Sequence, residues 1–172
     1  MFKKLFGASS MEPLSDGLRA LIETQLSEFC ASLFRALELG AQASQQAPAD
    51  ARETFMKVES AADSARASLS RIADLWPAGK SAFAGLTNIA VLLPRWIENL
   101  KSWQVLIETL EADSRKDRNL EEYRQFQMKG RQYSAGMDKG LADAASELSK
   151  IGISFDSIQA KSLERQSLAG QQ

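Results

Sequence analysis

A nearly error-free heptad pattern between Leu86 and Leu110 restricts the fold of this chain more than any other feature. With Leu86 at position a, apolar residues fill every a and d position through four heptads: Leu86, Ile89, Leu93, Trp96, Leu100, Trp103, Ile107 and Leu110. The e and g positions are also mostly apolar, and only Gln104 and Asn99 interrupt them. A helix with so wide an apolar face needs several helical neighbours, so the pattern predicts a helical bundle.

The length and charge of the chain narrow its class further. Its 172 residues are enough for one domain with a proper core, and its net charge of −1 does not favour nucleic acid. The single cysteine, Cys30, cannot form an intrachain disulfide, which is typical of a reducing compartment. The longest apolar run, residues 89–93, is too short to span a bilayer. We therefore expect a cytoplasmic protein, with peripheral membrane attachment as an alternative.

Apolar spacing at helical intervals predicts three more long helices. The first covers residues 15–39, with Ser15 or Asp16 as its N-cap, and a small, polar loop follows over residues 40–48. The second begins at Asp50, which forms a capping-box pattern with Glu53, and ends at a turn over residues 76–80. The heptad helix then runs to about residue 112. The fourth helix runs from residue 119 and ends at Gly152, a typical glycine C-cap.

These elements predict an all-α protein, an antiparallel up-down-up-down four-helix bundle with coiled-coil-like heptads. We expect a flexible or amphipathic N-terminal segment over residues 1–10 and one bundle domain over residues 11–153. Residues 154–172 are expected to form a short helical turn and a disordered tail.

Small residues in the neighbouring helices predict the register of the bundle, because bulky indoles need small partners. In the hairpin of the second and third helices, the residue numbers of two facing residues sum to about 158, which places Ala62 opposite Trp96. In the hairpin of the third and fourth helices the sum is about 232. The predicted pairs there are Trp96 with Gly136, Leu92 with Gly140, and Trp103 with Gly130.

Groups that carry chemistry are scarce in the sequence. The chain has no histidine, which removes histidine-based relays and the usual bundle di-iron site. Cys30 lies at helical spacing with apolar residues and is expected to be a small buried hydrophobe. Glu108 and Glu111 could serve a metal-dependent carboxylate enzyme, but the heptad directs Glu108 toward solvent. We therefore expect no catalytic residues, no metal and no cofactor.

The N-terminus carries the one chemical hint above this background. Phe2, Leu5 and Phe6 are bulky and apolar, and Lys3 and Lys4 lie between them. Such a segment could contact an anionic membrane surface weakly. A terminus that is disordered or tucked against the core is the alternative.

The favoured function is that of a non-enzymatic protein-interaction module, such as an adaptor, an inhibitor or immunity-type protein, or a chaperone-like bundle. Its partner is expected to be another protein or a second copy of the chain. The eleven-residue apolar rhythm of the first helix differs from the heptads elsewhere, so this helix is the predicted binding face. The residues of that face are Leu21, Leu26, Phe29, Leu33, Phe34 and Leu37.

Overall fold

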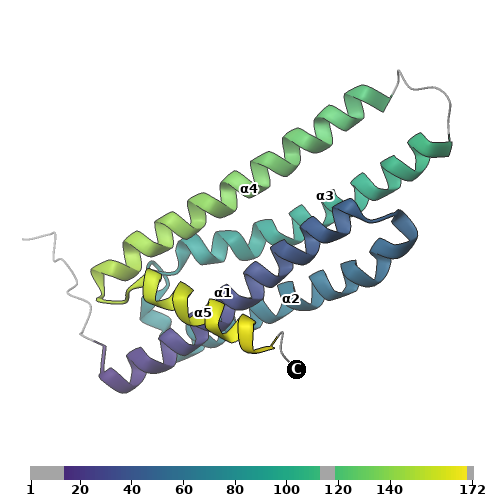
Figure 1. The fold of residues 1–172 in the computed structure, drawn as a ribbon. Coiled ribbons are helices and arrows are strands. Elements are labelled where there is room, and N and C mark those ends of the chain that lie inside the picture. Colours follow the sequence, from purple (N-terminus) through teal and green to yellow (C-terminus); the bar gives the residue numbers. More distant parts are fainter. Residues whose placement is uncertain (1–13, 113–118, 170–172) are drawn as a thin grey trace, which may run out of the picture.

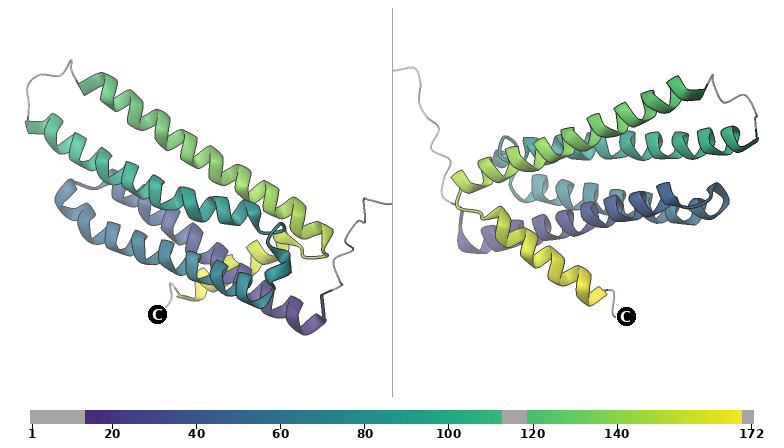
Figure 2. Two further views of the ribbon diagram at one scale, coloured as in Figure 1. Left: turned by 180° about the vertical axis from the view of Figure 1, so that it is seen from behind. Right: turned by 45° about the horizontal axis from the view of Figure 1, so that its top comes forward.

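The computed structural model of the chain is all-helical over the residues that it describes, 14–112 and 119–169. It contains α1 (Asp16–Gln45), α2 (Pro48–Leu75), a short 3-10 turn η1 (Pro77–Gly79), α3 (Ala84–Ala112), α4 (Asn119–Lys150) and α5 (Phe155–Ala169). Helices α1 and α2 form one hairpin, and α3 and α4 form a second hairpin laid against it (Figure 1). Figure 2 shows the two hairpins as two layers, with α5 crossing α1 on the outer side.

The packing of α4 differs from that of a closed four-helix bundle. In a closed bundle α4 would lie beside α1. Within residues 14–112 and 119–169, the α4 backbone comes close to α3 and α5 but not to α1 or α2. Its middle section carries the polar residues Gln127 and Ser134, both exposed, where a closed bundle would need apolar side chains.

The fifth helix corrects the predicted disordered tail. The Ser154 hydroxyl accepts a hydrogen bond from the Ser157 amide and so caps α5. Phe155 and Ile158 are buried in the same core as the long helices, and Lys161 pairs with Glu23 of α1 at 3.3 Å. The tail is helical because α1 offers it a surface on which to bury these two apolar side chains.

Helix ends confirm some of the predicted signals and correct others. Ser15 caps α1, and Gly152 (φ 77°) ends α4 in a Schellman motif in which the Ile153 amide donates to the Leu148 carbonyl. The predicted Asp50 cap is wrong: α2 begins at Pro48. Proline suits the first helical position because its fixed φ is already helical there.

Helix α1 continues six residues beyond its predicted end, through Gly40. A Cβ at Gly40 would overlap the Trp96 indole, so the glycine lets the α3 ring lie against the α1 backbone. The Gln104 amide donates to the Ala43 carbonyl at 2.6 Å near the end of the same helix. Contacts with α3 therefore stabilise the segment that the local sequence predicted as a loop.

The observed register lies about one helical turn from the predicted one between α3 and α4. Gly136 lies against Leu92 instead of Trp96, and Gly140 lies against Ile89 instead of Leu92. Gly130 lies near Asn99 instead of Trp103, whose ring meets the Tyr123 ring at a tilt with centroids 4.8 Å apart. The antiparallel pairing of glycines with large α3 side chains is nevertheless as expected, because close backbone approach is what these glycines permit.

Burial along α3 follows the heptads but weakens toward its C-terminal end. The first four a and d residues are buried, whereas Leu100, Trp103 and Ile107 are half-buried. Gln104 and Leu106 in the same half are buried, so the wide apolar face of α3 is only partly covered there.

Candidate binding groove

An open groove of about 790 Å³ runs between the second half of α2 and the first half of α3. Most of its lining is apolar, and many of its wall residues are small. It is lined by Arg66, Leu69, Ser70, Ala73, Trp76, Lys80, Phe83, Ala84, Thr87, Ala90, Val91 and Pro94. Its volume falls in the range of ordinary ligand and peptide sites.

One end of the groove is closed by aromatic rings. Trp76 ends α2, and its indole meets the Phe83 ring edge-to-face with centroids 5.8 Å apart. Gly79 of η1 lies so close to the indole that a Cβ there would overlap it. The 3-10 turn thus holds both rings in a rigid corner.

The groove lies between these rings and an ion-pair network farther along the two helices. Lys101 of α3 donates a hydrogen bond to Glu59 of α2, and its Nζ also lies 3.5 Å from the Glu98 carboxylate. The hydrogen bond to Glu59 raises the pKa of Lys101 and keeps the ammonium charged. The numbers of Glu59 and Lys101 sum to 160, close to the predicted register of α2 against α3.

Val91 is the exposed large apolar side chain among the described residues that line the groove. It is 51% exposed and comes from the part of α3 that also gives Ala90 and Pro94 to the lining. Two polar groups of the lining already have partners: Arg66 pairs with Asp63, and the Thr87 hydroxyl donates to the Phe83 carbonyl. The groove therefore offers mainly apolar contact to a molecule that enters it.

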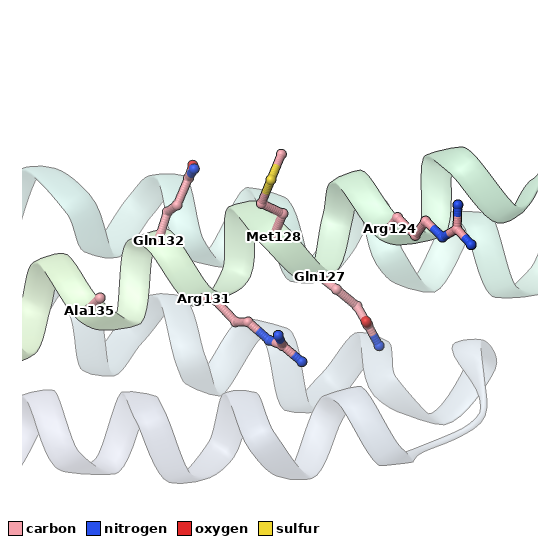
Figure 3. A pocket seen from close by; sticks show the side chains of 6 residues that line it. All are labelled: Arg124, Gln127, Met128, Arg131, Gln132 and Ala135. Carbon is pink, nitrogen blue, oxygen red and sulfur yellow. The ribbon is translucent and has the colours of Figure 1, made fainter.

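A second, shallower hollow of about 510 Å³ lies along α4 (Figure 3). Gln127 and Arg131 project to one side of the helix and Met128 and Gln132 to the other (Figure 3). All the residues that line it come from this one helix, and Met128 is the one large apolar side chain among them. Four of its six lining residues carry polar or charged side chains and it has a single wall, so it is the weaker candidate.

The predicted face of the first helix is mostly interior. Leu26, Phe29 and Leu33 are fully buried, and Phe34 and Leu37 are half-buried against the same core. Leu21 is the exposed member, at 54%. The buried stripe packs inside the fold and presents no surface in this conformation.

The remaining predictions concern the N-terminal segment and a metal site. Phe2, Lys3, Lys4, Leu5 and Phe6 lie outside the described residues. The described part of the chain holds no group of three or more acidic or cysteine side chains arranged for a metal ion.

Glu108 and Cys30, both singled out for chemistry, are not among the residues that line the groove. Glu108 is exposed, and the Glu111 side chain is not among those described. Cys30 is buried as expected, and burial raises its pKa to about 12. Nor is any described helix long and apolar enough to cross a membrane.

One feature of the sequence outside the a and d positions of the heptads indicates the groove. Val91 occupies position f, opposite the a and d seam, where a polar residue is typical of a surface helix. Ala84 occupies the same position one heptad earlier.

No protein-family model, no curated protein and no solved structure matches the chain.

Proposed function

We propose that this chain is a non-enzymatic protein-interaction module that binds an amphipathic helix of a partner protein in the α2/α3 groove. The observation that carries the proposal is Val91, a half-exposed apolar side chain in the lining of a mostly apolar groove. We further propose that the four long helices serve as its antiparallel frame and that it acts in the cytoplasm, since its one cysteine cannot form an intrachain disulfide.

The shape of the groove favours a helical partner. It runs along two neighbouring helices, and its span from Arg66 to Trp76 is about 15 Å, the length of about ten helical residues. Ser70, Ala73 and Ala90 in its walls leave room for a third backbone to approach closely. Partner side chains at helical spacing would then meet Val91 and the aromatic corner.

Site-specific photocrosslinking in the native cells tests the proposal. Benzoylphenylalanine replaces Val91 in one variant and Val105 in a second; both residues are exposed and lie two heptads apart on α3. We expect a protein adduct from position 91 that position 105 does not give. Adding Ala73→Glu to the first variant should remove the adduct, because a carboxylate would enter the apolar groove. Equal adducts at both positions, or no adduct at 91, would overturn the proposal.

A further inference from the structure

We infer that the groove is occupied by the chain's own N-terminal segment, through Phe2, Leu5 and Phe6, when no partner is bound. The inference rests on the proposed function, because it concerns regulation of the same groove. A partner helix would have to displace this segment, which lowers the apparent affinity of the module until the segment is released.

The path of the chain brings the segment to the correct end of the groove. Helix α1 begins at Asp16 and pairs with α2 as a hairpin, so its first turn lies at the same end of the fold as the end of α2 (Figure 1). That end holds the Trp76 and Phe83 corner of the groove. Leu14, the first described residue, already packs against the core.

The distance is also within reach. Phe6 lies eight positions before Leu14, and an extended chain over eight positions spans about 26 Å. The groove itself is about 15 Å long. When extended, the residues that connect the segment to α1 can therefore span more than the length of the groove.

The side chains of the segment suit an apolar groove with small walls. Phe2, Leu5 and Phe6 have the spacing i, i+3, i+4, which places them on one face of a helix. The groove offers them the exposed Val91 and the space above Ala73. Binding would remove these three large apolar side chains from water, which favours the occupied groove.

The charges of the segment match the rim of α2. Lys3 and Lys4 fall on the opposite face of the same helical turn and would point outward. Asp63 and Asp74, both exposed, lie eleven residues apart on α2 and hence on one side of that helix, next to the lining residues Arg66 and Ala73. Arg66 is already paired with Asp63, which reduces its repulsion of the lysines, while Lys80 remains a positive charge in the lining.

Thiol labelling of the full-length protein tests the inference. Cys30 is buried with a raised pKa, so an engineered thiol gives the measured signal. The rate at which N-ethylmaleimide modifies Val91→Cys is compared with and without the added changes Phe2→Ser, Leu5→Ser and Phe6→Ser. We expect the three changes to raise the rate by about tenfold, because they release the segment.

Val105→Cys is the matched control for this measurement. Val105 is 62% exposed on the same helix but does not line the groove, so its rate should not change. A second measurement uses disulfide formation between Gly7→Cys and Val91→Cys, which we expect to exceed that between Gly7→Cys and Val105→Cys. Equal labelling of Val91→Cys in both backgrounds, or equal disulfide formation in both pairs, would overturn the inference.

The two proposals fail in different ways. If the segment does not protect Val91→Cys but photocrosslinking at position 91 still finds a partner, the groove binds a partner and the self-occupancy is wrong. If the segment protects Val91→Cys but no partner adduct forms even with Phe2, Leu5 and Phe6 replaced by serine, the partner proposal is wrong and the self-occupancy stands.

Discussion

Gly40 lets the Trp96 ring of α3 lie directly against the α1 backbone, since a Cβ there would overlap the ring. We expect Gly40→Ala to lower the free energy of unfolding by about 1–3 kcal/mol, because overpacking outweighs the higher helix propensity of alanine. Gly17→Ala is the matched control. Gly17 lies in the first turn of the same helix with open space around it, so its substitution should stabilise the protein by about 0.5 kcal/mol. Urea denaturation of both variants measures the difference, and stabilisation by both would contradict it.

Cys30 provides a pH test of the core. Its pKa is raised from the ordinary 9.0 to about 12 because burial disfavours the thiolate. The folded state thus keeps the proton after the unfolded state has lost it. The resulting stability is fully present below pH 9 and is lost as pH rises from 9 toward 12, by up to about 1.4 kcal/mol per pH unit.

Urea denaturation at several pH values measures how the free energy of unfolding falls as the pH rises from 9 toward 12. The Cys30→Ala variant is the control, and its free energy of unfolding should fall less steeply over the same pH range by the contribution of this one thiol. Identical slopes in the two proteins would show that the thiol does not titrate differently on folding.

Helix α5 is attached to the fold through a small set of buried side chains, Phe155, Ile158 and Ser162. Ile158 is buried against the core, whereas Leu163 of the same helix is 59% exposed. We expect Ile158→Asp to release α5 from α1, because an unpaired carboxylate cannot stay buried. Leu163→Asp should change the free energy of unfolding by less than about 0.5 kcal/mol.

Hydrogen exchange of the α5 amides distinguishes these outcomes. Exchange over residues 155–164 should accelerate in the Ile158→Asp variant and stay near the original rate in the Leu163→Asp variant. Exchange in α2 should be unchanged in both, since α5 packs on α1 and α4. Equal acceleration in the two variants would mean that Ile158 does not anchor the helix.

At the scale of the whole molecule, the two ends of the α3/α4 hairpin should differ in local stability. Leu86, Ile89 and Leu93 are buried, whereas Trp103 and Ile107 are half-buried. Regions with little buried apolar surface open more readily. We expect backbone amides of residues 86–97 to exchange at least about tenfold more slowly than those of residues 100–107. Uniform protection along α3 would contradict this gradient and would imply that another surface covers its C-terminal half.

The local sequence determined the helical class, the cores of four helices and several of their ends. The buried face from Leu86 to Trp96 could be predicted because a buried helix face requires apolar residues at helical spacing. That spacing can be read from the sequence of one helix alone. The cap at Ser15 and the glycine C-cap at Gly152 were likewise predictable, because each acts within one turn of backbone.

Only the tertiary structure decided the features that depend on two segments far apart in the chain. Gly40 is helical because Trp96, 56 positions later, lies against it. The tail forms α5 because α1 buries Ile158. The groove exists because α2 and α3 both place small residues on their outer sides around Val91. Such features arise from packing between helices, whose relative placement one sequence pattern does not contain, so the candidate site became visible only in the folded protein.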